Sequence, residues 1–262
     1  MLPLLRHARY VVSENPVTGL AFTLFALFLI AALFGPAIAP YSPLQSNAAM
    51  ALKPPSAAHW FGTDQLGRDI FSRVLVATRL DLSIAFASVI LAFLLGALSG
   101  VAAGYFGGWT DQVVGRLADT IMAFPLFVLA MGIVAALGNE VINIVIATAI
   151  INFPLYARVA RAEANVRRDA GFVEAARLSG NREARVLLGH VLPNIMPIMM
   201  VQMSLTMGYA ILNAAGLSFI GLGVRPPDAE WGIMVAEGAN FIQSGEWWIA
   251  LFPGATLMLA VF

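Results

Sequence analysis

The sequence predicts an all-α polytopic membrane protein with six transmembrane helices. Apolar residues make up 60% of its 262 residues, charged residues make up 11%, and the mean hydropathy is +0.81. Because a typical soluble domain carries about 25% charged residues, this chain has too little polar surface to cover itself in water. Its apolar runs are also long, and about 20 apolar residues suffice to cross a hydrocarbon layer of roughly 30 Å as a helix.

The first expected span covers residues 17–39 and follows Arg6, His7 and Arg9, which place the N-terminus on the cytoplasmic side. No small-residue cleavage pattern follows this run, so we expect an uncleaved helix rather than a signal peptide. The other spans are expected at residues 82–105, 113–137, 141–156, 195–219 and 247–262. The fourth span is short, and Pro154 with the arginines after it indicates that its helix continues into the cytoplasm. The sixth is also short, and we expect the chain to stop inside its last helix.

The longest polar connection, residues 41–80, is expected to be an ordered, turn-rich outer loop because it contains Pro54-Pro55, Gly62 and Gly67. At its end, Ile70, Val74 and Ala77 fall on one helical face and predict a short interfacial helix. Residues 223–246 are acidic on balance and are also expected outside.

The second span carries Gly96, Gly100 and Gly104, a spacing that permits close packing of helices in lipid. This pattern fits either a helix buried at the centre of a bundle or a face for a partner subunit. The fifth span is rich in methionine, which more often fills gaps in a core than binds a metal.

The third span contains Arg116 and Asp119, and an ionisable group inside a span is a functional candidate. Three residues apart on one helix, the two side chains can form a local ion pair. Because both lie near the inner end of the span, we favour this structural pairing over contact with a substrate.

One polar stretch, residues 169–194, interrupts the second half of the chain. Its spacing predicts a short helix, a break at Gly180 with positive φ, and a second helix over residues 182–190 capped by Asn181 and stopped at 192–194. Between residues 158 and 185 there are seven arginines and four acids, which places this stretch in the cytoplasm. Composition alone is equally consistent with an ordinary solvated loop.

The same stretch contains E-A-A, three residues, Gly, nine residues, and then H-V-L-P. This pattern resembles the EAA loop of ABC importer permeases, with His190 where the general motif has Ile, and the His version is similar to the peptide and nickel branch. Residues 54–73 and 217–232 resemble segments of that branch as well. The positions that match the EAA motif are Glu174, Ala175, Ala176, Gly180, Leu192 and Pro193.

The resemblance implies a type I ABC importer permease fold in a bacterial inner membrane, with loop 165–194 as the cytoplasmic coupling segment. It divides the chain into residues 1–80, with the first helix and outer loop, and a permease core of residues 81–262 that would continue beyond Phe262. The implied partners are a second homologous permease, two ABC ATPases and a periplasmic or lipid-anchored substrate-binding protein. Ala175 and Ala176 would allow close approach of the ATPase, and Glu174 would pair with a nearby arginine.

The chain carries no sign of catalysis of its own. It has no phosphate-binding loop, no G-x-S-x-G, no H-E-x-x-H and no cysteine, and its net charge of zero gives no case for nucleic-acid binding. We therefore expect no catalytic residue, metal site or cofactor, with ATP hydrolysed by partner subunits.

An ion-gradient secondary transporter is the alternative of another class, but such carriers usually show an inverted repeat and acids near mid-membrane, which this sequence lacks. Within the resembled branch we favour di- or oligopeptides as substrates. A nickel chelate and glutathione remain alternatives.

Overall fold

The computed structural model describes residues 15–262, and the predicted cytoplasmic signal of Arg6, His7 and Arg9 lies outside them. Two compact units are present: one comprises residues up to Ser83 together with Ser218–Phe262, and the other comprises Ile84–Leu217. Helices α3 (Ile70–Phe106) and α9 (Leu192–Phe219) each belong to both units. The first unit therefore contains both the predicted N-terminal part and the C-terminal helices. The sequence-based division at residue 80 places those C-terminal helices in the permease core.

In the first unit, α2 (Pro16–Ile38) begins at Asn15, whose side chain accepts a hydrogen bond from the Val17 N–H at 3.0 Å. Helices α10 (Trp231–Ala239) and α11 (Trp248–Val261) pack against each other, and α11 also contacts α2. Phe28 of α2 meets Trp231 edge to face, with ring centroids 5.8 Å apart. Helices α10 and α11 thus form the packed pair of this group, and α2 lies against them with most of its apolar surface exposed.

The loop before α3 is ordered, as its proline and glycine content predicted. Its two arms are joined by backbone hydrogen bonds from Asn47 to Leu66, from Leu52 to Asp64 and from Thr63 to Lys53, each 2.9–3.0 Å long, around the short helix η1 (Ala48–Met50). The predicted separate interfacial helix is wrong, because α3 runs from Ile70 to Phe106 as one helix of 37 residues. Arg73 interrupts the hydropathy pattern, but it is buried within 3.8 Å of the Asp64 carboxylate instead of marking a helix end in water.

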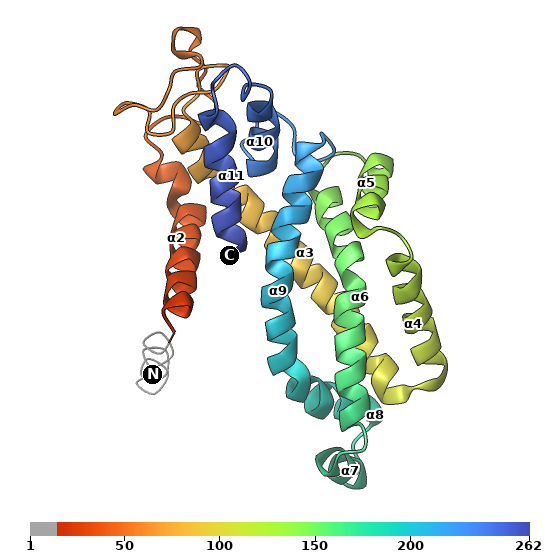
Figure 1. Ribbon diagram of the computed structural model, residues 1–262. Helices are drawn as coiled ribbons and strands as arrows, with labels where there is room; N and C mark the ends of the chain where they lie inside the picture. Colours follow the sequence, from red (N-terminus) through yellow and green to blue (C-terminus); the bar gives the residue numbers. More distant parts are fainter. Residues whose placement is uncertain (1–14) are drawn as a thin grey trace. The chain divides into compact units, whose positions relative to one another are not determined.

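In the second unit, the third predicted span is a bent pair of helices. Helix α4 (Gly108–Met122) ends before Pro125, and α5 (Leu126–Leu137) continues after a bend of 90°. Proline lacks an N–H and disfavours a helical conformation at the residue before it, so the hydropathy run is continuous while the helix is not. Both helices pack on α6 (Val141–Arg167), which continues past Tyr156 as predicted (Figure 1).

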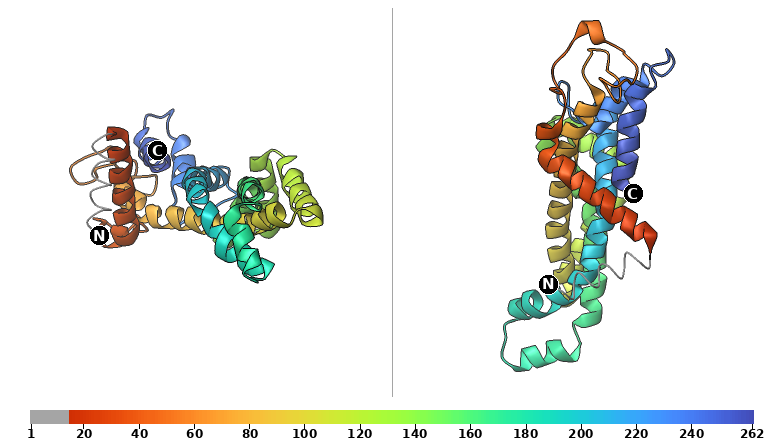
Figure 2. Two further views of the ribbon diagram at one scale, coloured as in Figure 1. Left: turned by 90° about the horizontal axis from the view of Figure 1, so that it is seen from below. Right: turned by 90° about the vertical axis from the view of Figure 1, so that its left-hand side faces the viewer.

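Helix α6 leads into α7 (Gly171–Leu178), α8 (Glu183–Val186), a π-helical turn η2 (Leu187–Val191) and then α9. The predicted stop at residues 192–194 is wrong, because α8, η2 and α9 form one helical run that lies alongside α6 (Figures 1 and 2). The wider π turn precedes Pro193, and Asn194 donates its side-chain amide to the His190 carbonyl at 2.7 Å. The helix therefore passes a proline that sequence rules read as a terminus.

Among residues 15–262, four helices are long and apolar enough to cross a membrane, or five spans if the α4–α5 pair counts as one. Helix α11 is apolar but has only 14 residues. The protein is thus all-helical and polytopic in this part of the chain.

The three glycines of α3 pack against α6 inside the chain. A Cβ atom at Gly96 would lie 2.6 Å from the Tyr156 Cβ, and one at Gly100 would lie 2.3 Å from the Ala157 carbonyl oxygen. A Cβ atom at Gly104 would lie 2.2 Å from the Arg161 carbonyl oxygen. The reading of this stripe as a helix buried within the bundle is confirmed, and the stripe is not a free face for a partner subunit.

We predict that Gly100→Ala destabilises the protein by about 1–3 kcal/mol, because the new methyl group collides with backbone that can move only if the helices separate. The matched control is Gly115→Ala in α4, where a Cβ meets no atom within 4 Å and should stabilise the helix by about 0.5–1 kcal/mol. Thermal unfolding of the two purified variants in the same detergent measures the difference. Equal stability of the two would contradict the observed packing.

Candidate functional site

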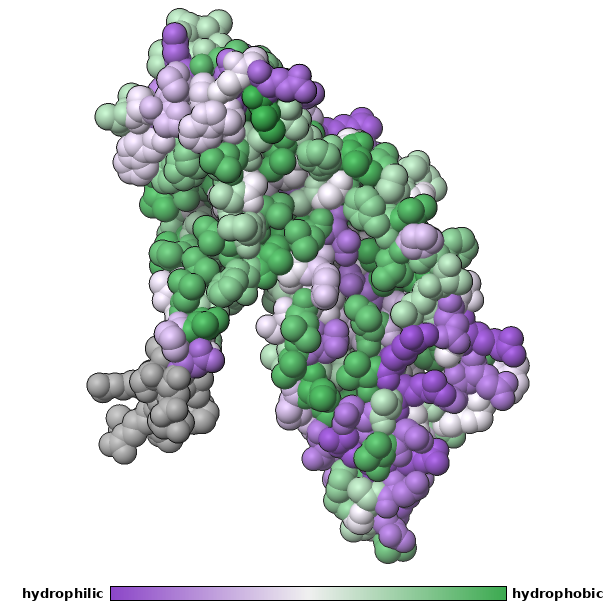
Figure 3. All heavy atoms as spheres, viewed as in Figure 1, coloured by the Kyte–Doolittle hydropathy of each residue, from purple (hydrophilic) through white to green (hydrophobic). Residues whose placement is uncertain are grey.

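In the second unit, hydrophilic residues gather at the end that carries α7 and α8 and along α4, whereas α5 is apolar (Figure 3). Helix α7 begins after Ala170, buries Val173 and Ala176, and ends in a Schellman motif. In this motif the Gly180 N–H donates to the Arg177 carbonyl at 2.9 Å and the Asn181 N–H to the Ala176 carbonyl at 3.4 Å.

Gly180 adopts the predicted left-handed conformation, with φ +77°. A Cβ atom at this position would meet no atom within 4 Å, so the requirement for glycine is conformational and not steric contact with a neighbour. The sharp return of the chain from α7 to α8 depends on this residue.

Asn181 does not cap the following helix as predicted. The N-cap of α8 is Arg182, which makes no side-chain capping bond, and the Asn181 side-chain amide instead donates to the Ala176 carbonyl at 2.9 Å. Asn181 therefore stabilises the end of α7, because the last carbonyls of a helix lack partners within the helix.

The exposed surface of this segment is partly apolar. The side chain of Leu178 is 84% exposed and that of Val166, at the end of α6, is 77% exposed, and Phe172 is also exposed. Glu174 and Ala175 lie on the exposed side of α7. Exposed apolar patches rimmed by polar residues mark contact sites for other proteins, and these side chains are candidates for such a patch.

Ala176 differs from its neighbour Ala175. It is only 7% exposed and packs inside the chain, so it cannot offer a surface to a partner as the sequence suggested. The two alanines of the motif thus have separate places, one in the core of the segment and one on its surface. Leu192 and Pro193, by contrast, are the first two residues of α9.

Glu174 forms no ion pair within residues 15–262, so the expected partner arginine is not found there. The side chains that hold the segment are Tyr105, Arg177 and Glu183, which meet at the end of α3. Sequence reasoning missed Tyr105, because a tyrosine at the end of an apolar run usually marks the membrane interface.

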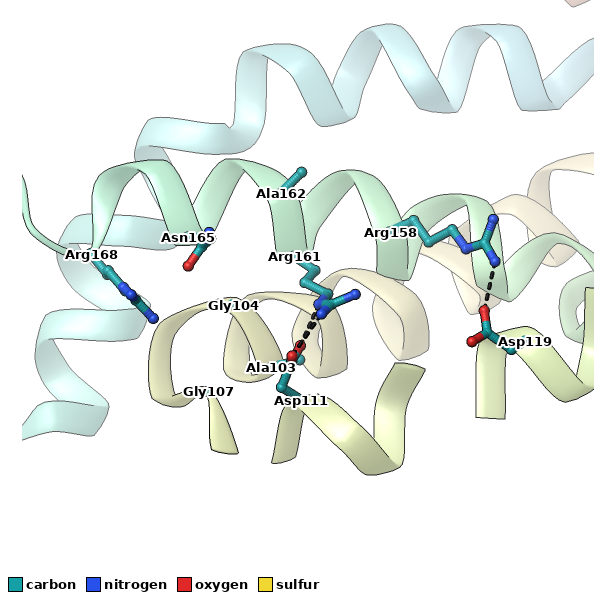
Figure 4. A pocket seen from close by; sticks show the side chains of 10 residues that line it. All are labelled: Ala103, Gly104, Gly107, Asp111, Asp119, Arg158, Arg161, Ala162, Asn165 and Arg168. Atoms are coloured by element: carbon teal, nitrogen blue, oxygen red, sulfur yellow. Dashed lines mark hydrogen bonds and ion pairs between the residues drawn. The ribbon is translucent and has the colours of Figure 1, made fainter. Parts of the chain in front are cut away.

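Asp119 has a different partner from the one predicted. Its carboxylate accepts a hydrogen bond from Arg158 of α6 at 2.7 Å, and no ion pair joins it to Arg116 in the described part of the chain. A second pair joins Arg161 of α6 to Asp111 of α4 at 2.6 Å. The two pairs flank a hollow of about 510 Å³ between the polar ends of α3, α4 and α6 (Figure 4).

The Arg158–Asp119 pair is exposed, since its side chains are 50% and 70% exposed, whereas the Asp111 side chain of the second pair is 28% exposed. An exposed ion pair contributes about 0–1 kcal/mol to the free energy of folding. The Arg158–Asp119 pair therefore aligns α4 with α6 more than it stabilises their packing. The same helices share an apolar contact of Ala118 with Phe153 and Ala157. This arrangement supports a structural role for Asp119.

An all-helical membrane protein whose polar segment leaves α6 and returns into α9 is the fold expected of a transport permease. Residues 92–262 match the family of binding-protein-dependent transport system inner membrane components, and residues 4–55 match the N-terminal transmembrane domain of oligopeptide transport permease C. The chain therefore belongs to the ABC importer inner-membrane permeases, in the branch that includes the dipeptide, oligopeptide and nickel systems. It is a multi-pass protein of the inner membrane.

Curated relatives agree along nearly the whole chain. A dipeptide transport system permease of Alkalihalophilus pseudofirmus is 40% identical over 98% of this chain and 84% of its own length. A nickel transport system permease of Escherichia coli is 38% identical over 96% of this chain and 91% of its own length. A glutathione transport system permease of Pectobacterium atrosepticum is 39% identical over 79% of this chain and 68% of its own length.

The two alanines of α7 provide a test of the local packing. Ala176→Trp should destabilise the protein by about 1–3 kcal/mol, because its side chain has no room inside the segment. Ala175→Trp should change stability by less than about 0.5 kcal/mol, as expected for an exposed position. Thermal unfolding of the purified variants compares them, and a destabilisation by Ala175→Trp as large as that by Ala176→Trp would contradict the assignment.

Proposed function

We propose that this chain is the permease subunit of an ATP-driven, binding-protein-dependent importer of di- or oligopeptides, and that α7 couples it to an ATPase. The observation that carries the proposal is the exposed apolar surface of α7, set beyond the end of α6 by a glycine-dependent turn. Mechanical coupling between two subunits requires a rigid contact, and α7 is a short helix that its own chain holds through Val173 and Ala176. Loop 165–194 is then the segment that the ATPase moves.

The roles within this segment follow from where each residue lies. Ala175, Phe172 and Leu178 form the contact surface for the ATPase. Glu174 lies beside them, and its carboxylate, which has no ion pair within residues 15–262, meets a basic group of the partner. Gly180 sets the turn, and Leu192 and Pro193 pass the movement into α9. The chain itself binds no nucleotide, and two partner ATPases carry out hydrolysis.

A second, homologous permease completes the translocation path, with residues 81–262 as the core of this subunit. Since α6 covers the glycine stripe of α3, the candidate surface for that partner is the exposed apolar face of α9, which includes Val201, Leu205 and Tyr209. A periplasmic or lipid-anchored binding protein delivers the substrate from outside.

The choice of peptides rests on the relatives, among which dipeptide systems of several bacteria are about 40% identical to this chain. The nickel and glutathione permeases are similar at 38% and 39%, so these substrates are the alternatives to test. An ion-gradient transporter gives no role to the exposed α7 surface, which is why we place it behind the ATP-driven importer.

We further propose six spans with both ends in the cytoplasm, counting the bent α4–α5 pair and α11 as one span each. Loop 41–69 and residues 223–246 then lie outside, and loop 165–194 inside. The chain contains no cysteine, so single cysteines report on topology without background. Ala57 and Arg182 are both exposed, and among the described residues the Arg182 side chain has no hydrogen-bond partner.

Ala57→Cys should therefore react with a membrane-impermeant maleimide added to intact cells, whereas Arg182→Cys should react only after the membrane is opened. Mass-shift labelling on a gel measures both, with total labelling in detergent as the control for reactivity. Labelling of Arg182→Cys in intact cells would contradict the proposed topology.

The coupling role predicts that Gly180→Val lowers binding-protein-dependent transport at least tenfold while the protein still inserts. A β-branched residue is strained at positive φ by about 1–2 kcal/mol or more, and relief of that strain reorients α7. The matched control is Gly245→Val between α10 and α11, because Gly245 has φ +106° and an equally open Cβ position.

Gly180→Val should also weaken co-purification of the ATPases, and Gly245→Val should not. Uptake of labelled peptide and the amount of bound ATPase are measured on membranes that contain equal amounts of permease. Normal transport and normal ATPase binding by Gly180→Val would reject the coupling role of this segment.

A further inference from the structure

Three side chains from three helices meet at the end of α3. Tyr105 is only 5% exposed, and its hydroxyl donates a hydrogen bond to the carboxylate of Glu183, the first residue of α8. The same hydroxyl accepts a hydrogen bond from Nε of Arg177 at 3.2 Å. One oxygen atom thus binds side chains on both sides of the Gly180 turn.

Two further contacts close this cluster. The Arg177 guanidinium lies 5.1 Å from the centroid of the Tyr105 ring, within the range of a cation–π contact. Its Nε is 3.5 Å from the Glu183 carboxylate. Hydrogen bonds that include a charged group are stronger than neutral ones, and both bonds of the Tyr105 hydroxyl are of this kind.

The position of Tyr105 is itself fixed. Gly104, the residue before it, lies so close to α6 that a Cβ would sit 2.2 Å from the Arg161 carbonyl oxygen. Tyr105 therefore reaches α7 and α8 from a helix end that cannot shift without parting from α6. Within the part of the chain that the structure describes, no side chain of another membrane-spanning helix forms a hydrogen bond to α7 or α8.

We infer that Tyr105 is a positioning residue that ties α7 and α8 to the end of α3 and sets the angle at which α7 meets the ATPase. This inference rests on the proposed coupling role of α7. Movement of α7 by the ATPase reaches α3 directly through the Tyr105 hydroxyl, as well as along the chain through α6 and α9. Without the hydroxyl, α7 keeps its fold and its contact surface but loses its fixed orientation.

A tyrosine that merely fills space would behave differently. Tyr105→Phe keeps the ring, its packing and its contact with Arg177, and removes the hydroxyl alone. A space-filling role predicts no effect of this change on coupling, whereas a positioning role predicts loose coupling at nearly normal stability. The matched control is Tyr41→Phe, because the Tyr41 hydroxyl also donates a hydrogen bond, to the Ala58 carbonyl at 2.9 Å, but belongs to the loop before α3.

The first experiment uses the complex purified with its partner subunits and reconstituted in lipid vesicles. We expect Tyr105→Phe to lower the substrate transported per ATP hydrolysed, and the stimulation of ATP hydrolysis by loaded binding protein, by about threefold or more, because both charge-assisted hydrogen bonds of the hydroxyl are lost. Tyr41→Phe should leave both ratios unchanged. Unchanged ratios for Tyr105→Phe would overturn the inference.

The second experiment measures the orientation of α7 directly. A spin label at Leu178→Cys, in this cysteine-free chain, should become more mobile when Tyr105→Phe is added. Glu183→Gln retains an oxygen that can accept the tyrosine hydroxyl and should restrain the label better than Glu183→Ala. Adding Tyr105→Phe to Glu183→Ala should have little further effect, and fully additive effects would overturn the shared role of the two residues.

The two proposals fail in distinguishable ways. If Gly180→Val abolishes transport and Tyr105→Phe leaves coupling and label mobility unchanged, the inference about Tyr105 is wrong and the coupling role of α7 stands. If neither variant alters transport, the coupling role fails and the inference fails with it.

Discussion

The second unit depends on the backbone contact between α3 and α6. Three glycines bring the two helices so close that any side chain at these positions would collide with the other helix. Helices in lipid gain no hydrophobic driving force from meeting each other, so van der Waals contact between close backbones is what holds them. The contact also has a consequence at the polar end, because α6 leads into α7 and Tyr105 lies in the last turn of α3. The position of α7 thus depends on a contact that begins several turns away.

The first unit is held in another way, by charges buried with their partners. Arg68 lies between the Asp64 carboxylate and Glu237 of α10, at 3.4 Å from the latter, and Arg73 donates to the Pro43 carbonyl at 3.0 Å. Glu230 is fully buried and accepts the N–H groups of Gly232 and Ile233 at 3.0 and 2.8 Å, which caps α10, and burial raises the pKa of this carboxyl. Buried charges are tolerated only when they are paired or hydrogen-bonded. These contacts therefore hold the loop before α3, the start of α3 and α10 together.

Hydropathy alone located the apolar helices, because burial in lipid selects for length and composition, and the left-handed turn at Gly180 followed from helix-ending rules. Where the predictions failed, long-range contacts decided the outcome. The burial of Arg73 depends on its contact with Asp64, which the sequence does not reveal. The continuation of the helix through Pro193 depends on a π turn, which has no sequence signal. The partner of Asp119 lies 39 residues away on α6, and the burial of Ala176 beside exposed Ala175 depends on how α7 folds back on its own chain. Tyr105 was missed for the same reason, since its importance comes from Arg177 and Glu183.

We propose that this importer subunit meets an ATPase through the exposed α7, while its other helices line and support a path through the membrane. The most direct measurement is photo-crosslinking in native membranes from a benzophenone amino acid placed at Leu178, the most exposed large apolar side chain of α7. Mass spectrometry of the adducts identifies the captured protein, and the same probe at exposed Trp60 in the outer loop serves as the comparison. The account predicts an ATPase adduct from Leu178 and none from Trp60. An ATPase adduct from Trp60, or capture from Leu178 of lipid alone, would contradict it.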